Sequence, residues 1–167
     1  MGRRRALAFI GIFISLFIVL YTPGQAANPL DATVTINAVA ILTVTQEEID
    51  FGSVPGLTSG PQPPVTVNLN AKCNRKPGYT VYVRGQNPYF NSLDGDPQSF
   101  PLSRLEFLPS GAASYAAVTT SDQMVYEGAR NTTAAGDSFS VLFRLNLSGD
   151  EASGTYTNTL TFTIVAK

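Results

Sequence analysis

After residue 31, apolar and polar side chains alternate along much of the chain, a period of two that predicts β-strands. The longest alternating run covers residues 32–45, and one of its faces carries a row of apolar residues: Val34, Ile36, Ala38, Ala40 and Leu42. At about 3.3 Å per residue this run would extend roughly 46 Å, whereas an ordinary strand has about five or six residues. We therefore expect it either to bend from one sheet to another or to leave the domain with its front part.

Shorter alternating runs between turn residues predict the other strands. Residues 65–73 and 79–84 form a hairpin in this interpretation, joined by a turn at Lys76-Pro77-Gly78, with Cys73 and Tyr79 facing inward. We expect an irregular connection over residues 85–101, and no segment after residue 26 has a helical period. The remaining strands are expected at residues 49–54, 102–108, 115–119, 123–127, 139–147 and 156–164.

About seven to nine short strands with frequent turns predict an all-β fold, a single immunoglobulin-like or pilin-like β-sandwich. A jelly roll or a small barrel is the alternative. The chain has no tryptophan and one cysteine, which argues against the core of a true antibody domain. Five aromatic residues are expected in the core: Tyr79, Phe139, Phe143, Tyr156 and Phe162.

The first 26 residues have the pattern of a secretory signal peptide. Three arginines, Arg3 to Arg5, precede 15 apolar residues at 6–20, and the small residues Gly24 and Ala26 suit a cut after position 26. As a helix, the apolar stretch would span about 22 Å, less than the roughly 30 Å of a membrane core, which favours cleavage over a retained anchor. We expect residues 1–26 to be the signal peptide and residues 27–167 the β-sandwich domain, exported to the cell-envelope surface or beyond, with no membrane attachment after cleavage.

The charge composition argues against one class of function, nucleic-acid binding. Charged residues make up 14% of the chain, and removing the three leader arginines leaves eight basic against twelve acidic side chains, a net charge of −4. A mildly acidic domain with scattered cations lacks the clustered positive charge that nucleic-acid binding needs. We expect no nucleic-acid partner.

Candidate chemistry is sparse, because the chain has no histidine and therefore no histidine base, triad or metal ligand. Cys73 is expected either as a buried apolar residue or in an intermolecular disulfide. Asp94, Asp96 and Asp137 suit calcium by ligand type, but the spacing is not that of an EF-hand and a turn is the simpler interpretation. Glycoside hydrolysis needs a carboxylate pair, and the available carboxylates lie mostly at strand ends or turns. We expect no enzyme activity, no cofactor and no metal site.

Tyr89 and Phe90 lie within the long connection and form the candidate ligand loop. Two aromatic rings could stack against a sugar or a partner protein. The alternative is that they pack the connection onto the sandwich.

Several segments resemble exported bacterial β-sandwich proteins related to spore coat protein U and to fimbrial subunits. The resemblance is carried by the opening alternating run, by the strand ending at Cys73, and by four short motifs at residues 50–54 (DFGSV), 78–81 (GYTV), 100–105 (FPLSRL) and 154–163 (GTYTNTLTFT). Those families commonly have paired cysteines, whereas this chain has one. The resemblance implies a pilin-like sandwich without catalytic residues.

Fimbrial subunits polymerise by donating an extended strand to a neighbour, a form of β-augmentation. The resemblance therefore makes the row Val34, Ile36, Ala38, Ala40 and Leu42 a candidate donor strand, and an ordinary first strand within one sandwich is the alternative. The predicted function is a structural or self-assembling surface protein, a filament, coat or matrix subunit, whose partners are copies of itself or other envelope subunits. The second interpretation is a secreted binding or adhesion module that recognises carbohydrate or a surface partner.

Overall fold

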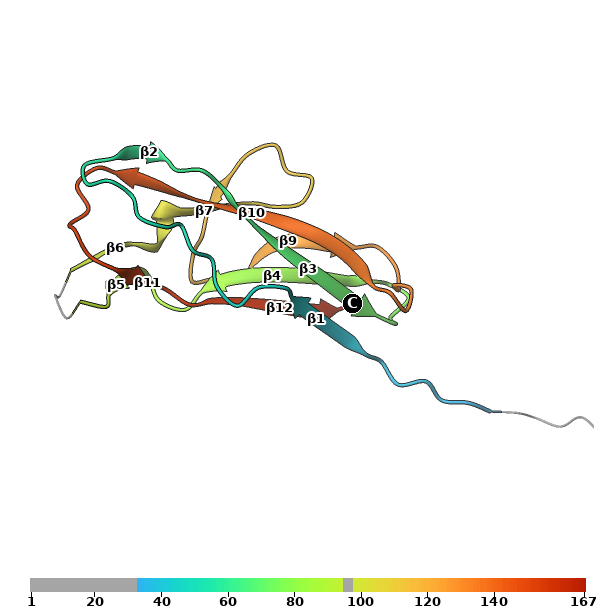
Figure 1. Cartoon of the computed structure of the whole chain (residues 1–167). Helices are drawn as coiled ribbons and strands as arrows, with labels where there is room; N and C mark the ends of the chain where they lie inside the picture. Colours follow the sequence, from blue (N-terminus) through green and yellow to red (C-terminus); the bar gives the residue numbers. More distant parts are fainter. Residues whose placement is uncertain (1–32, 95–97) are drawn as a thin grey trace, which may run out of the picture. The chain divides into compact units, whose positions relative to one another are not determined.

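A computed structural model describes residues 33–94 and 98–167 (Figure 1). The predicted signal peptide, residues 1–26, lies outside the described residues. Residues Ile36–Lys167 form one compact unit, and the description below concerns this unit. Within the described ranges, no helix has the length and apolar character that a membrane span requires.

Twelve strands and one short 3₁₀ helix follow one another in the described residues. They are β1 (Ala40–Val44), β2 (Ser59–Pro61), β3 (Val65–Cys73), β4 (Tyr79–Gly85), β5 (Tyr89–Ser92), β6 (Ser99–Pro101), η1 (Leu102–Arg104), β7 (Leu105–Leu108), β8 (Ala116–Ala117), β9 (Gln123–Gly128), β10 (Asp137–Ser148), β11 (Tyr156–Thr157) and β12 (Leu160–Ala166). There are more strands than the sequence predicted because several of them have only two or three residues.

The strands form three antiparallel sheets. The largest has the order β1-β3-β10-β7-β8, and β2 pairs with the end of β10. The second has the order β12-β4-β9, and the third, at the end of the unit opposite the β3–β4 turn, has the order β11-β5-β6 (Figure 1). Consecutive strands β3 and β4 lie in different sheets, so the predicted hairpin partners are separated between the two layers.

The largest sheet and the β12-β4-β9 sheet pack face to face around one apolar core. Phe143 of β10 meets Phe162 of β12 edge-on, with 6.1 Å between ring centroids. Tyr126 of β9 stacks on Phe139 of β10 at 4.1 Å. The all-β sandwich is therefore confirmed, as is the inward orientation of Cys73 and Tyr79. Of the aromatic residues expected in the core, Tyr79, Phe139 and Phe143 are buried, whereas Tyr156 and Phe162 are only half-buried.

Several further predicted elements differ from the structure. The strand predicted over 102–108 begins with the 3₁₀ helix η1, and the strand predicted over 115–119 is reduced to the two residues of β8. Residues 49–54 form no strand, because the Gly52 N–H donates to the Asp50 carboxylate at 2.7 Å and a local turn replaces sheet pairing. The connection over 85–101 is not irregular, since β5 and β6 pair within it. The last predicted strand is interrupted at Asn158, whose side chain donates to two carbonyl groups beside β5 and so separates β11 from β12.

The β3–β4 turn closes one end of the unit. Gly78 has φ +93, and a Cβ atom there would lie 1.9 Å from the carbonyl oxygen of Gly128. Beside it, the buried Tyr79 hydroxyl donates to Asp137 at 2.8 Å. Burial, together with this hydrogen bond, raises the pKa of the Tyr79 hydroxyl far above its ordinary range. Only glycine suits position 78, because both its backbone conformation and its lack of space exclude a side chain.

We expect Gly78→Ala to lower the free energy of unfolding by about 3 kcal/mol or more, since it combines a left-handed residue with a backbone clash. The matched control is Gly111→Ala, because Gly111 also has positive φ (+80) but open space around it. The control should cost only about 1 kcal/mol. Urea denaturation of both variants measures the difference, and equal losses would contradict the packing at Gly78.

Candidate assembly site

Strand β12 carries an apolar row that faces the core but is incompletely covered. The row consists of three alternating residues: Leu160, Phe162 and Ile164. Each is only half-buried, whereas the β4 residues paired with them are fully buried: Gly85, Val83 and Val81. The difference arises because β4 has neighbours on both sides, β12 and β9, while β12 has one neighbour in its sheet.

Strand β1 shows the same incomplete cover. Its residues Ala40, Leu42 and Val44 are paired with the buried β3 residues Cys73, Ala71 and Leu69, and therefore point to the same side. Nevertheless Ala40 and Val44 are exposed and Leu42 is half-buried. The core-facing side of β1 is thus uncovered where the opposite sheet ends at β12.

We define the open edge as these two apolar rows, one on β1 and one on β12. The two strands approach each other within 8 Å between Cα atoms, but no main-chain hydrogen bond joins them in the described part of the chain. The backbone groups of β12 that point away from β4 are likewise unpaired there. An apolar wall beside unpaired strand backbone is the surface to which an added β-strand binds.

The residues just before β1 are fixed by one side chain. Asn74, directly after β3, donates from its amide to the carbonyl oxygen of Asn37 at 2.7 Å and accepts from the Val39 N–H at 2.7 Å. This clamp fixes the main chain of Asn37 and Val39 beside the β3–β4 turn. Sequence reasoning missed Asn74, and the available signal was an asparagine at the end of a predicted strand.

The structure divides the candidate donor strand. Ala40 and Leu42 belong to β1 and pair within their own sheet, opposite Cys73 and Ala71, so these two residues are not free for donation. Val34 and Ile36, in contrast, are 81% and 79% exposed, and Ala38 is exposed as well. The part without a partner strand among the described residues is 33–38, which we call the leading segment.

The β1 register makes a direct test possible. Ala40 and Cys73 form a non-hydrogen-bonded pair, because the neighbouring pair of Val39 and Asn74 is the hydrogen-bonded one. Such pairs have Cα atoms about 4.5 Å apart, within the range of a disulfide. We expect Ala40→Cys to form an intramolecular disulfide with Cys73 on oxidation, detected as monomer in non-reducing electrophoresis with loss of both thiols. Disulfide-linked dimers through position 40 would show instead that this residue pairs with another copy.

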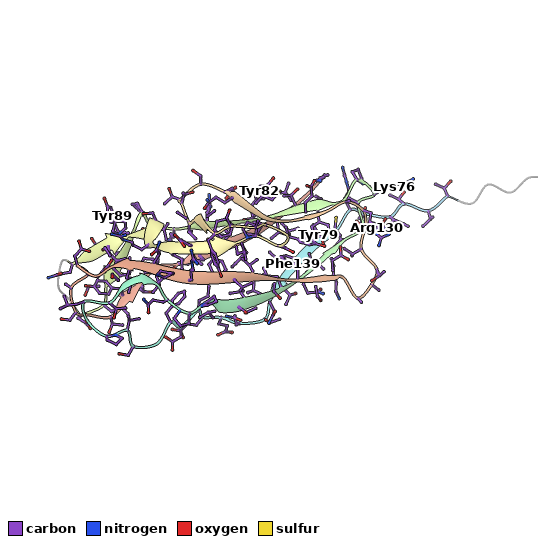
Figure 2. The ribbon with its side chains drawn as sticks, turned by 90° about the horizontal axis from the view of Figure 1, so that it is seen from above. Lys76, Tyr79, Tyr82, Tyr89, Arg130 and Phe139 are labelled. Atoms are coloured by element: carbon purple, nitrogen blue, oxygen red, sulfur yellow. The ribbon has the colours of Figure 1, made fainter. Side chains whose placement is uncertain are left out.

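In the candidate ligand loop, the rings of Tyr89 and Phe90 are not both exposed to solvent. Phe90 lies in β5, is 8% exposed and stacks on Phe100 with 4.7 Å between centroids. Tyr89 is 50% exposed, because neighbouring residues of a strand point to opposite faces. Only Tyr89 of the two is therefore available to a ligand. In Figure 2 it lies at the end of the unit opposite Lys76 and Arg130.

A hollow of about 300 Å³ lies at the same end as Tyr89, lined by Arg104, Asp150, Glu151 and Tyr156 among others. Although burial acts to raise the pKa of Glu151, hydrogen bonds from Ser148 and Gly149 outweigh it and lower the pKa to about 2. The Ser148 and Gly149 N–H groups each donate to this carboxylate at 2.9 Å. Arg104 lies 3.6 Å from it. Glu151 therefore holds the turn after β10 as a carboxylate.

Because the folded-state pKa of Glu151 is depressed, its contribution to stability is present above the unfolded pKa near 4.5 and is lost as pH falls toward about 2. We expect Glu151→Gln to lower the free energy of unfolding at pH 7 by up to about 3 kcal/mol. The gap from the unmodified chain should close as the pH falls from 4.5 to 2.5. Urea denaturation at several pH values checks this, with Glu47→Gln, an exposed site, as the control for net charge. A gap independent of pH would contradict the assignment.

The remaining candidate residues have structural partners. Cys73 is a buried free thiol. Asp137 accepts from Tyr79, and Asp94 accepts from the Thr155 N–H at 2.6 Å. Glu106 accepts from Arg144 at 2.7 Å and from Asn146, and these hydrogen bonds lower its pKa despite the opposing effect of burial. Across residues 33–94 and 98–167, no three acidic, cysteine or histidine side chains gather as a metal site would require.

Comparison with known proteins supports the fold. No protein-family model matches the chain, and no curated protein matches it. Among solved structures, the chain is similar to a chain in the structure described as "Chaperone-tip adhesin complex is vital for synergistic activation of CFA/I fimbriae biogenesis", with 10% identity and a TM-score of 0.51. The likeness covers 75% of this chain and 42% of that one, so this chain spans less than half of its length. At this identity the likeness concerns the fold.

Proposed function

We propose that this protein is a non-catalytic structural subunit of an exported surface assembly, and that it associates by donor-strand exchange. The leading segment of one copy, residues 33–38, would add as a strand to the open edge of another. One observation carries the proposal: the half-buried row on β12 lies beside unpaired strand backbone, in a chain that also has an exposed alternating segment.

The leading segment and β12 match in spacing. Val34, Ile36 and Ala38 recur at every second position, as do Leu160, Phe162 and Ile164. Paired strands place directly opposite residues on the same face, so one apolar row would cover the other. Six residues extend about 20 Å, close to the roughly 23 Å of the seven-residue β12. In the sequence, Leu30 and Ala32 continue the alternation and offer further apolar side chains.

The threonines of the leading segment suit its other face. Thr33 and Thr35 alternate with the apolar row and would point to solvent in an added strand. Threonine is also favoured in strands because its branched side chain packs well on a pleated surface. The segment therefore has both the binary pattern and the propensity of an edge strand, although it has no partner strand within the described residues.

Adding a strand between β1 and β12 requires the open edge to widen. Neighbouring strands lie about 4.8 Å apart, so the two strands that flank an inserted one stand about 10 Å apart. Their present approach within 8 Å means that β1 must move outward. Such movement is feasible because β1 has only five residues and is bonded on one side only, to β3.

Export and partner choice complete the proposal. The signal-peptide pattern over 1–26 supports export of the mature chain, and its partners would be further copies of this chain or other envelope subunits. The fold likeness to a chain of a chaperone–tip adhesin complex of fimbriae supports an assembly of this kind. Because the chain has a single cysteine, each subunit of such an assembly is stabilised by packing and hydrogen bonds, without an internal disulfide.

Charges on the apolar row of the leading segment test the proposal. We expect Val34→Asp/Ile36→Asp to abolish formation of large assemblies by the mature protein, because burying two carboxylates in an apolar groove is strongly unfavourable. Size-exclusion chromatography and electron microscopy measure assembly. The melting temperature should remain within about 2 °C, since the Val34 and Ile36 side chains are both exposed.

The matched control is Thr33→Asp/Thr35→Asp, which adds the same charge to the opposite face of the same segment and should leave assembly intact. A synthetic peptide of residues 28–39, added to the Val34→Asp/Ile36→Asp variant, should raise its melting temperature by filling the open edge. Equal behaviour of the two double variants, or a peptide that leaves the melting temperature unchanged, would refute donation.

A further inference from the structure

Positive charge gathers at the end of the unit that holds the β3–β4 turn. Five of the eight Lys and Arg residues after the leader lie there: Lys72, Arg75, Lys76, Arg130 and Lys167. Contacts place them together, since Arg75 donates to the main-chain oxygen of Lys167 at 3.0 Å and the turn at Gly78 abuts the main chain of Arg130. Figure 2 shows Lys76 and Arg130 at this end, with Tyr89 at the opposite one. We call this region the basic end.

Most of these cations have no ion-pair partner among the described residues. Two carboxylates have contacts there: Glu127 forms an ion pair with Lys167, and Asp137 accepts a hydrogen bond from the uncharged Tyr79 hydroxyl and so keeps its negative charge. Lys72, Lys76 and Arg130 are exposed and form no ion pair with the residues that the structure describes. A surface with unpaired cations attracts an anionic partner and repels a like surface.

The opposite end has the complementary charge. Asp150 and Glu151 line the hollow there, and Arg104, already beside Glu151, is the one cation among the residues that line it. Asp94, near by through its hydrogen bond to Thr155, is exposed and adds a further negative charge. Phe100 and Tyr156, in edge contact at 5.0 Å, form an aromatic part of the wall. Carboxylates beside aromatic rings suit the ammonium or guanidinium group of a side chain.

The clamp at Asn74 connects these ends to assembly. It holds Asn37 and Val39 at the basic end, so a donated leading segment leaves almost no free chain between the two copies. The basic end of the donor must then lie against the acceptor. Contact with the acceptor's own basic end would bring like charges together, whereas contact with its hollow would bring opposite charges together.

We propose that Lys76 and Arg130 of one copy dock on the acidic hollow of the next, so that copies associate end to end with one direction. This inference rests on the proposed donor-strand exchange and adds the surface that orients it. The charge complementarity accelerates encounter and disfavours wrong orientations, while the donated strand supplies most of the affinity.

Charge reversal tests the docking surface in the mature full-length chain. We expect Lys76→Glu/Arg130→Glu to slow elongation at low ionic strength by about tenfold or more, measured by light scattering. Elongation of the unmodified protein should itself slow as salt is added. The reciprocal variant, Asp94→Lys/Asp150→Lys, should be slow alone, and an equimolar mixture of the two variants should recover most of the rate. Arg84→Glu, outside both regions, is the control and should elongate normally.

The peptide of residues 28–39 separates failure of this inference from failure of donation, because it carries the strand without the basic end. Peptide binding to the Lys76→Glu/Arg130→Glu variant, with slow elongation, supports both proposals. A peptide that binds no version of the chain overturns donor-strand exchange. Normal elongation of the charge variant despite peptide binding overturns the docking surface. If the charge variant elongates normally but does not bind vesicles of anionic lipid that the unmodified chain binds, the docking surface is overturned and the basic end is assigned to a membrane surface.

Discussion

Strand pairing on one side only is the constraint on which the rest of this structure depends. β4 is flanked by β12 and β9, and its inward residues are buried completely, whereas β12 ends the sheet and leaves Leu160, Phe162 and Ile164 half-buried. An edge strand with an apolar face is a hazard, because it can pair with any exposed strand. Here β1 lies beside this edge without bonding to it, so the edge is partly shielded and still accessible. Because β1 is short and bonded only to β3, it can shield the β12 edge and still leave room for an added strand.

The unit remains stable because the other faces are complete. Core residues from β3, β4 and β10 are almost fully buried, and aromatic contacts such as Phe143 with Phe162 join the two layers. Fully burying each large apolar side chain stabilises the fold by about 2 kcal/mol, which explains how the chain does without a disulfide. The two ends of the unit are held by hydrogen bonds of buried or half-buried polar side chains. Tyr79 and Asp137 hold one end, and the Glu151 carboxylate holds the turn at the other. Rigid ends would favour the proposed assembly, because a surface that is ordered beforehand loses less entropy on association.

Assembly in this view divides two tasks between two surfaces. The apolar rows of the open edge favour association with any strand that has the right alternation, and they carry little information about orientation. Charge supplies that information, because Lys76 and Arg130 lie at the end from which the leading segment starts, and Asp150 lies at the other. The Asn74 clamp couples the two surfaces, since it fixes the start of the segment beside the basic end. In the proposed assembly, affinity and direction are therefore set by different residues of one chain.

The sequence by itself determined the class of fold, the main strands and their inward faces, because a period of two depends only on local backbone geometry. Residues 65–73, 79–84 and 123–127 illustrate this, and so does the burial of Cys73. Tertiary structure decided what pairs with what. Ala40 and Val34 lie in one unbroken alternation, yet one pairs with β3 and the other has no partner strand among the described residues, since pairing depends on where β3 ends and on the Asn74 side chain. The burial of Phe90 was likewise not predictable from the sequence, because it depends on stacking against Phe100 across the pairing of two very short strands. The open edge and the charged ends arise from residues far apart in the chain, and no local pattern encodes which of them meet in space.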